Sequence, residues 1–396
     1  MKVLQINSVC GYGSTGKIAY DLCKVLESNG HECVVAYGRG SAPKDIKTIK
    51  IGADKDVKVH GSVSRITDKH GFYSKNATKR FIKQIKEYDP DIIHLHNIHG
   101  YYINVELLFD YLSKADKKVI WTLHDCWAFT GHCSYFDYVG CEKWKEKCYN
   151  CLQKHRYPKS LFFDNSKWNY QMKKKLFPSV KDMTIVTPSK WLANLVKQSF
   201  LSKYPVKVIY NGIDLDVFKP TPSDFREKYN LEDKFIVLGV ASVWEKRKGL
   251  DDFIKLSKML SDKYKVVLIG LSKKQKDNLP GNIIGITRVS DSTGLAQIYT
   301  AADVFVNPTY EEVFGLTNVE ALACGTPIIT YDTGGSIESV NARCGIIVER
   351  GNIQMLVKKI MNFDSNYFTT KNCIERANMF DKDYRFIDYM KVYNWR

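Results

Sequence analysis

Residues 310–325 read Tyr-Glu-Glu-Val-Phe-Gly-Leu-Thr-Asn-Val-Glu-Ala-Leu-Ala-Cys-Gly, so that two carboxylates, Glu312 and Glu320, flank a Phe-Gly step. An apolar run precedes this stretch, and a helical pattern follows it as far as Gly325. The pattern predicts a strand, a glycine-containing turn and the start of a helix. Because a helix N-terminus has free N–H groups and partial positive charge, such a turn can hold a phosphate. The two acids could then bind hydroxyl groups of the molecule that carries the phosphate, which points to a sugar nucleotide.

Strand-like and helix-like segments alternate along nearly the whole chain, a pattern typical of parallel sheets covered by helices on both faces. The chain has 396 residues, which is too long for one core and suits two domains. We expect an N-terminal doubly wound domain over residues 1–206, a second over 207–373, and a terminal helix over 374–396, with a break at Asp381–Asp383, that returns to the first domain. The predicted strands are Val3–Ile6, Glu32–Tyr37, Ile92–His96, Lys118–Leu123, Thr184–Thr187, Phe235–Val240, Lys265–Ile269, Ile283–Ile286, Val304–Asn307 and Pro327–Tyr331.

The composition and charge of the chain limit the kinds of partner that it can bind. A formal net charge of +16 favours anionic partners such as nucleotide phosphates, nucleic acid or an anionic membrane face. No nucleic-acid-binding motif is present, and the Lys and Arg residues are scattered rather than grouped, so we expect no nucleic acid. No apolar run is long enough to span a bilayer, and the N-terminus is typical of a first strand rather than a signal peptide. We therefore expect a cytoplasmic protein.

Three segments of the first domain follow predicted strands, where an open parallel sheet has its ligand crevice. A glycine loop, Gly11–Gly16, follows the first strand and lets a phosphate or sugar approach the backbone. It matches G-x-G-x-x-G, but no acid closes the second strand, so the dinucleotide-binding pattern is incomplete. The segment His94–His99 and the pair His124-Asp125 end the next two strands. These side chains could hydrogen-bond a substrate or simply order their own loops.

The second domain has two cations, Arg247 and Lys248, at a predicted strand-to-helix turn. Positive charge in that position can neutralise a diphosphate leaving group. The alternative is an ordinary solvated charge cluster. D-x-D matches occur at Asp89, Asp214 and Asp381, but none closes a strand at the expected donor crevice. We therefore expect no catalytic metal.

A cysteine-rich insert over residues 126–151 contains four thiols with the spacing Cys133-x7-Cys141-x6-Cys148-x2-Cys151. Four thiolates fit a closed, structural zinc site, and a metal could hold together a loop that has no core pattern of its own. Free or redox-active thiols and an iron–sulfur cluster are the alternatives. Two segments that combine basic and aromatic residues, 69–80 and 167–177, could rest on an anionic membrane or be ordinary surface.

Together these motifs resemble the retaining glycosyltransferases of family 4. The pattern Glu312-Val-Phe-Gly-Leu followed by Glu320-Ala is similar to the E-x7-E motif of that family. The likeness extends over nearly the whole chain, and the cysteine-rich insert resembles a subgroup from bacterial surface-polysaccharide gene clusters. The further matching segments are the N-terminal glycine loop, Asp91-Ile-Ile-His-Leu-His-Asn97, His124-Asp125, Thr187-Pro-Ser-Lys190, Ile209-Tyr-Asn-Gly-Ile-Asp214, Lys248-Gly249 and Cys324-Gly-Thr-Pro327.

The resemblance implies a GT-B fold, in which two Rossmann-like domains enclose the active cleft, and sugar transfer with retention of configuration. Arg247 and Lys248 would bind the donor diphosphate, Glu312 the donor sugar and Glu320 the ribose. A departure is that many members have a further Arg before the Lys-Gly step, where this chain has Ser242-Val243-Trp244. The remaining implied donor contacts are the amides of Phe314, Gly315 and Leu316, the loop of Arg288 and Val289 around the base, His124 at the sugar, and Gly13 and Gly16 near the phosphate.

The predicted function is therefore transfer of a hexose-type sugar from a UDP- or GDP-linked donor to a glycan acceptor, in bacterial surface-polysaccharide biosynthesis. The acceptor is expected to be lipid-linked, which would place the enzyme peripherally on the inner face of the cell membrane. His96, Asn97 and His99 are the residues expected on the acceptor side. The main alternative is a sugar-nucleotide epimerase of the same fold. A zinc-dependent nucleic-acid binder and an NAD-dependent oxidoreductase are further alternatives.

Overall fold

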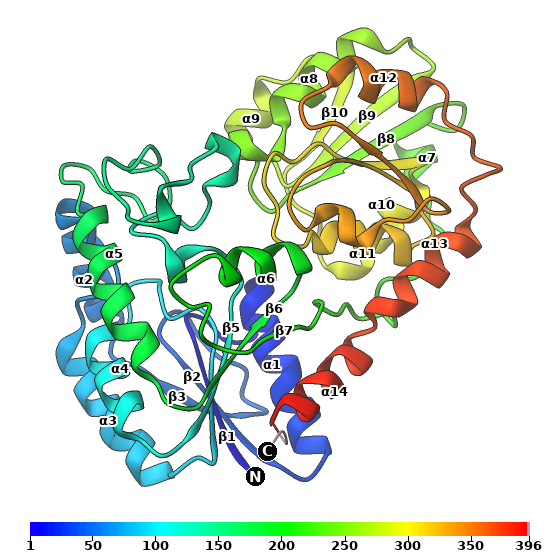
Figure 1. Ribbon diagram of the computed structural model, residues 1–396. Coiled ribbons are helices and arrows are strands. Elements are labelled where there is room, and N and C mark those ends of the chain that lie inside the picture. Colours follow the sequence, from blue (N-terminus) through cyan, green and yellow to red (C-terminus); the bar gives the residue numbers. More distant parts are fainter. Residues whose placement is uncertain (394–396) are drawn as a thin grey trace. The chain divides into compact units, whose positions relative to one another are not determined.

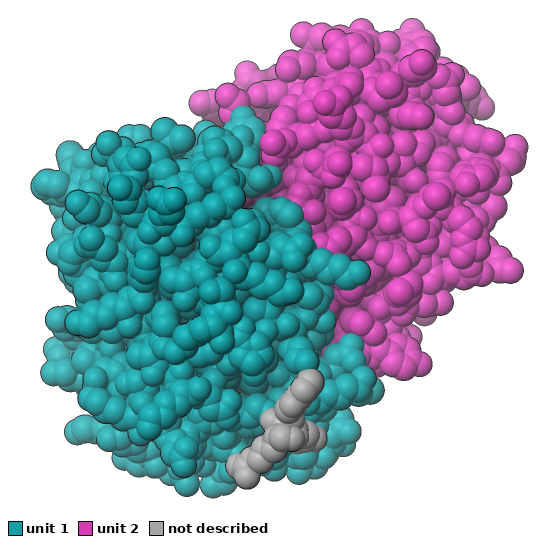
Figure 2. Space-filling model, viewed as in Figure 1, with its two compact units in different colours: residues 1–209, 386–396 teal, residues 210–385 magenta. Residues whose placement is uncertain are grey.

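The computed structural model describes residues 1–393 and consists of two compact units, each built on one parallel sheet (Figures 1 and 2). Unit 1 comprises Met1–Ile209 with Phe386–Arg396, and unit 2 comprises Tyr210–Arg385. Each unit has the doubly wound α/β architecture that the alternation of strands and helices predicts.

The sheet of unit 1 has seven strands in the order β3-β2-β1-β4-β5-β6-β7, all parallel. Helices α3, α4 and α5 lie on one face of the sheet, and α1 and α14 lie on the other (Figure 1). The strands are β1 (Lys2–Asn7), β2 (Glu32–Tyr37), β3 (Lys47–Lys50), β4 (Ile92–Leu95), β5 (Lys118–Thr122), β6 (Met183–Thr187) and β7 (Val206–Val208). The helices are α1 (Gly13–Ser28), α2 (Asp54–Thr67), α3 (Lys75–Tyr88), α4 (Val105–Lys114), α5 (Ser166–Leu176) and α6 (Lys190–Lys197).

The sheet of unit 2 has six parallel strands in the order β10-β9-β8-β11-β12-β13. Apolar clusters cover both of its faces, as in other parallel sheets that are covered by helices. The strands are β8 (Phe235–Val240), β9 (Tyr264–Ile269), β10 (Ile283–Ile286), β11 (Val304–Asn307), β12 (Ile328–Tyr331) and β13 (Gly345–Val348). The helices are α7 (Phe225–Lys228), α8 (Leu250–Met259), α9 (Lys273–Asp277), α10 (Ser292–Ala301), α11 (Leu316–Ala323), α12 (Ile353–Met361) and α13 (Thr370–Ala377).

The strand order reverses once in each sheet, between β1 and β4 in unit 1 and between β8 and β11 in unit 2. At such a reversal the loops leaving the two central strands diverge, and ligands bind in the crevice at their carboxyl ends. The glycine loop and the histidine segment follow β1 and β4, whereas the basic turn and the Glu312 loop follow β8 and β11. The topology therefore brings the predicted site segments together within each unit.

The end of the chain is helical on both sides of a break close to the predicted one at Asp381–Asp383. It consists of α13, a short 3-10 turn over Asn378–Phe380, and α14 (Lys382–Tyr393). Helix α14 begins in unit 2, and its residues from Phe386 onward belong to unit 1. Residues 394–396 of the expected helix lie outside the described part of the chain. The cysteine-rich segment is an irregular stretch between β5 and α5 that contains three short 3-10 turns.

Candidate functional site

An ion pair joins the two central loops of unit 2. Lys248, which follows β8, contacts the Glu312 carboxylate, which follows β11. The second Glu312 oxygen accepts a hydrogen bond from the Val313 amide at 3.2 Å. Burial opposes ionisation of Glu312, but the charges of Lys248 and Arg247 outweigh it and hold the pKa of Glu312 below its ordinary value. A negative carboxylate and a cation therefore meet at the reversal point of this sheet.

The backbone around Arg247 fixes the position of both loops. Its carbonyl accepts hydrogen bonds from the Tyr310 amide at 2.7 Å and from the Thr309 hydroxyl at 3.3 Å. Its guanidinium donates to the Glu311 carbonyl at 3.3 Å. Gly249, at φ +77°, lies so close to the β11 loop that a Cβ there would stand 2.3 Å from the Pro308 carbonyl oxygen. A side chain cannot fit there, so the Lys-Gly step is required for the two loops to approach each other.

Helix α11 begins directly after the Glu312 loop, with Gly315 as its N-cap at φ +82°. No side chain caps this N-terminus, which therefore keeps its positive end available for an anion. Glu320 lies one turn into the helix and accepts a hydrogen bond from Tyr299 at 3.0 Å. Burial raises the pKa of Glu320 to about 7, only partly offset by that hydrogen bond. The pKa of Glu312 is thus lowered and that of Glu320 is raised, although both residues flank the same turn.

Arg288 and Val289 lie apart from this ion pair, because β10 is separated from β8 by β9. They line a pocket with side chains from α7 and the residues that flank it, and from α10. Phe225 and Tyr229 form one of its walls, with their rings 4.8 Å apart. The pocket combines apolar rings with a cation and is suited to a flat, polar-edged ring such as a base.

In unit 1, a chain of hydrogen bonds runs from β1 through β4 to the end of β5. Gln5 Oε1 lies 2.9 Å from His96 Nε2, and His96 Nδ1 lies 3.1 Å from His124 Nε2. Gln5 is fully buried, and its amide nitrogen donates to the Ala19 carbonyl at 2.9 Å. That bond identifies Oε1 as the acceptor, so His96 Nε2 must donate to it and His96 Nδ1 must accept. His124 then donates from Nε2 and presents Nδ1 as a hydrogen-bond acceptor.

Burial keeps these imidazoles neutral. It lowers the pKa of His124 to about 4, an effect that Asp125 opposes, and lowers the pKa of His96 well below its ordinary value. The ring of His94 is tilted by 35° against that of His96, with their centroids 4.1 Å apart, and its nitrogens contact the hydroxyls of Tyr393 and Thr122 at 2.7 and 2.8 Å. Helix α14 therefore reaches the histidine segment through Tyr393.

The other predicted residues of unit 1 lie around the same sheet edge. His99 Nε2 lies 2.9 Å from an Asp125 oxygen, and the Asn97 amide donates to Asn7 Oδ1 at 3.2 Å. His96, Asn97, His99 and His124 line one small cavity. Gly13 opens α1 at φ +63° with open space beside it, and no side chain caps that helix. The α1 N-terminus thus remains free of side-chain caps, like that of α11.

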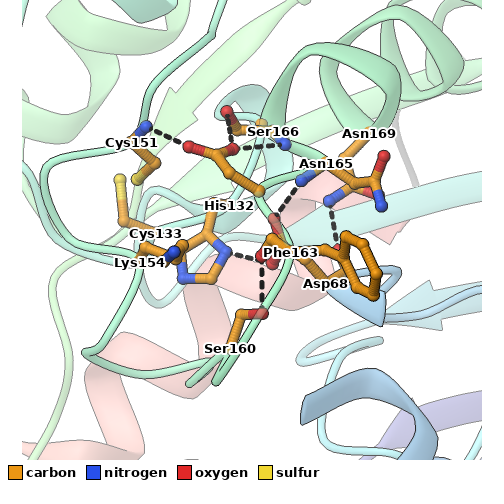
Figure 3. Close-up of polar contacts among 12 residues, drawn as sticks. Asp68, His132, Cys133, Cys151, Lys154, Ser160, Phe163, Asn165, Ser166 and Asn169 are labelled. Carbon is orange, nitrogen blue, oxygen red and sulfur yellow. Dashed lines mark hydrogen bonds and ion pairs between the residues drawn. The ribbon is translucent and has the colours of Figure 1, made fainter. Parts of the chain in front are cut away.

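The four predicted zinc ligands, Cys133, Cys141, Cys148 and Cys151, line one cavity of the insert. The Gly131 amide lies 3.2 Å from Cys148 Sγ and donates to it. Within residues 1–393, however, no group of three or more His, Cys, Asp or Glu side chains is placed to hold a metal ion. The insert also makes a buried polar contact with the end of α2, where His132 pairs with Asp68 (Figure 3).

Three buried polar residues of these regions were not predicted from the sequence. Gln5 interrupts an apolar strand, which was the available signal for a buried hydrogen-bonding role. Asp68 and Lys173 have polar neighbours in the sequence, so nothing in the sequence indicated that they are buried. Lys173 is buried in α5, where it donates to the Trp127 and Thr130 carbonyls at 2.8 and 3.1 Å. Burial lowers the pKa of Lys173 to about 7, although nearby thiols and carboxylates oppose the shift.

Comparison with protein families finds two adjoining matches that together span most of the chain. Residues 15–217, just over half of the chain, match the model described as "Glycosyltransferase Family 4". Residues 223–379 match the model described as "Glycosyl transferases group 1". The Lys248–Glu312 pair and Glu320 lie within the second match, and the Gln5-linked His96 and His124 lie within the first.

Individual proteins extend this likeness. The putative colanic acid biosynthesis glycosyl transferase WcaC of Escherichia coli is 24% identical over 373 residues, which cover 90% of each chain. An N,N'-diacetylbacillosaminyl-diphospho-undecaprenol alpha-1,3-N-acetylgalactosaminyltransferase of Campylobacter jejuni is 28% identical over 202 residues, 46% of this chain and 52% of that protein. Among solved structures, Anabaena HepE in complex with UDP has a TM-score of 0.70 at 16% identity and covers 99% of both chains. This structural likeness supports the GT-B fold.

Proposed function

Because this chain belongs to glycosyltransferase family 4 and is a glycosyltransferase of polysaccharide or glycolipid biosynthesis, we propose that it transfers a hexose-type sugar with retention of configuration. The donor in this proposal is a nucleotide sugar, and the acceptor is a lipid-linked glycan. The UDP complex of HepE supports a uridine nucleotide, and the undecaprenol-linked acceptor in the name of the Campylobacter relative supports a lipid-linked acceptor. An epimerase is not favoured, since both halves of the chain match transferase families.

The Lys248–Glu312 pair beside the uncapped N-terminus of α11 is the observation that carries this proposal. In the unliganded protein Lys248 is neutralised by Glu312. A donor diphosphate would offer Lys248, Arg247 and the helix N-terminus a stronger anion, and Glu312 would be released towards the sugar hydroxyls. As the sugar–phosphate bond breaks, negative charge grows on the diphosphate, and fixed positive groups stabilise that charge without reorganising. No metal is required for this step in the proposal.

His124 is proposed to contact the donor sugar from unit 1. Its neutral ring presents the Nδ1 acceptor, which suits a sugar hydroxyl donor. The acceptor hydroxyl then attacks on the face from which the phosphate leaves, and that phosphate takes the proton. The Arg288–Val289 pocket is proposed to hold the base, with Glu320 on the ribose hydroxyls.

The test of the diphosphate role is the substitution Lys248→Ala, with Lys246→Ala as the matched control because Lys246 is an exposed cation two residues away. We expect Lys248→Ala to lower the transfer rate by roughly 10²–10³-fold while the fold is retained. Lys246→Ala should retain near-normal transfer. Comparable activity of the two variants would remove Lys248 from the leaving-group site.

The class of reaction is tested separately by product analysis with and without acceptor. A transferase releases the free nucleoside diphosphate and a glycosylated acceptor, and the anomeric configuration of the product reports retention. Conversion of the donor into an isomeric nucleotide sugar without any acceptor would instead identify an epimerase.

A further inference from the structure

The segment Leu161–Phe163, together with the end of α2, forms an exposed apolar surface flanked by cations. Leu161, Phe162 and Phe163 are 46%, 67% and 59% exposed, and Ile66 at the end of α2 is 46% exposed. The Leu161 amide donates to the Arg65 carbonyl at 2.7 Å, which places the segment beside that helix end. We call Ile66, Leu161, Phe162 and Phe163, with Arg65, Lys154, Arg156 and Lys159, the apolar–basic patch. We propose that this patch binds the surface of an anionic membrane.

The patch rests on an ordered polar base. Ser160 is fully buried beneath it and donates to the Phe163 carbonyl at 2.7 Å, while the Ser160 amide donates to the Lys154 carbonyl at 2.9 Å (Figure 3). Just beyond the patch, Asp68 accepts the Asn165 amide at 2.8 Å. Hydrogen bonds therefore fix the backbone on both sides of the exposed rings. Large apolar side chains fixed outward in this way are typical of a binding surface.

The positive charges around the patch favour an anionic partner. Residues 152–163 contain Lys154, Arg156 and Lys159 and no acidic residue. Lys154 Nζ donates to the Phe162 carbonyl at 3.2 Å, so a cation is held at the backbone of the most exposed residue of the patch. Aromatic and aliphatic side chains that enter the acyl boundary, with cations at the level of anionic headgroups, are the features of an interfacial membrane contact.

The two basic–aromatic segments noted in the sequence, 69–80 and 167–177, are less suited to this role. Phe72 of the first is buried, and its ring packs 4.8 Å from that of Trp168 of the second. Lys69 lies over the same Trp168 ring at 4.4 Å. The aromatic groups of these segments are thus partners of each other, whereas those of the apolar–basic patch face outward.

Vesicle co-sedimentation tests the proposal with the full chain. We expect binding to vesicles that contain phosphatidylglycerol and much weaker binding to pure phosphatidylcholine vesicles. The double variant Phe162→Ser/Phe163→Ser should bind the anionic vesicles at least ~10-fold more weakly. The matched control is Tyr367→Ser/Tyr384→Ser, since these unit 2 residues are 55% and 64% exposed. The control should bind like the unaltered chain.

A second variant tests the contribution of the cations separately from that of the apolar side chains. Arg156→Glu/Lys159→Glu should lose the preference for phosphatidylglycerol while keeping the same melting temperature. The proposal is overturned if the unaltered chain fails to bind anionic vesicles at low salt, or if both double variants bind as it does. It is also overturned if Phe162→Ser/Phe163→Ser changes the oligomeric state instead of vesicle binding, because the patch would then be a protein interface. None of these measurements requires sugar transfer, so they are independent of the proposed function.

Discussion

At the scale of single residues, the site of unit 2 depends on two carboxylates whose surroundings differ. Glu312 has two cations beside it, and they keep it ionised despite its burial. Glu320 has only the Tyr299 hydroxyl, so burial dominates and its pKa rises to about 7. Sequence spacing predicted that both would flank the helix N-terminus, but only the packing around each side chain shows which one carries charge. We therefore expect the protonation of Glu320 to change in the neutral pH range.

This difference predicts a pH-dependent contribution of Glu320 to stability. The folded-state pKa is raised, so the stabilising contribution is complete below the ordinary glutamate value and is lost as the pH rises through about 7. The melting temperature of the unaltered chain should therefore fall relative to that of Glu320→Gln between pH 5 and pH 8. Scanning calorimetry of both proteins in the absence of donor measures the difference. Parallel melting curves across this range would contradict the raised pKa.

In unit 1, the single residue Gln5 is predicted to set the tautomer of His124 through His96. Gln5→Met removes the acceptor for His96 Nε2 while keeping a similar volume, so His124 should lose its preference for the Nε2–H form. Two-dimensional 15N NMR of the histidine rings reads this tautomer directly. We also expect a roughly 10-fold loss in transfer rate with little change in donor affinity. An unchanged His124 spectrum would show that the hydrogen-bond chain does not fix its tautomer.

At the scale of elements, the strands that position the site were predictable, whereas several elements around them were not. Strands β8, β10 and β11 are largely apolar runs, and their predicted limits agree with those of the structure. Helix α2 was missed because the residues that it buries, His60, Gly61 and Ser64, are not apolar and leave no hydrophobic period. The short strands β3, β7 and β13 were also missed. The pairing of Lys248 with Glu312 depends on β8 and β11 being neighbours, which follows from strand order rather than from local sequence.

Zinc binding by the cysteine-rich insert is still a prediction. Its four thiols line one cavity, although no metal-holding group is formed within the described residues. If zinc binds, the thiol side chains must turn towards a common centre, and metal binding would then add folding free energy to the insert. We expect about one zinc per purified chain, and less than half of that in Cys148→Ser. The control is Cys344→Ser, a buried cysteine of unit 2. Absence of zinc together with free alkylation of all four thiols would refute the hypothesis.

At the scale of the whole molecule, the chain ends on the unit with which it begins. Lys382, the first residue of α14, donates to Asp214 of unit 2 at 2.6 Å. Further along the same helix, Phe386, Tyr389, Val392 and Tyr393 are buried in an apolar cluster with α1 and the strands of unit 1. Lys118 of β5 donates to the last carbonyls of α14, those of Val392 and Tyr393, at 2.6 and 2.9 Å. The sequence indicated the aromatic spacing of this helix, but not that its tyrosines hydrogen-bond to His94 and Thr122.

The stability of unit 1 should therefore depend on Phe386, which lies near the end of the sequence. Phe386→Ala leaves a cavity between α14 and the sheet and should cost unit 1 roughly 3–4 kcal/mol of unfolding free energy. Tyr384→Ala on the same helix is the control, because Tyr384 is 64% exposed and its loss should cost less than ~0.5 kcal/mol. Urea unfolding followed by hydrogen exchange can assign each loss to a unit, since two units need not unfold together. The amides of β1 and β4 should lose protection in Phe386→Ala, while those of β8 and β11 should keep it. Equal loss in both sheets would show instead that the two units unfold as one, and that α14 transmits its packing energy to the whole chain.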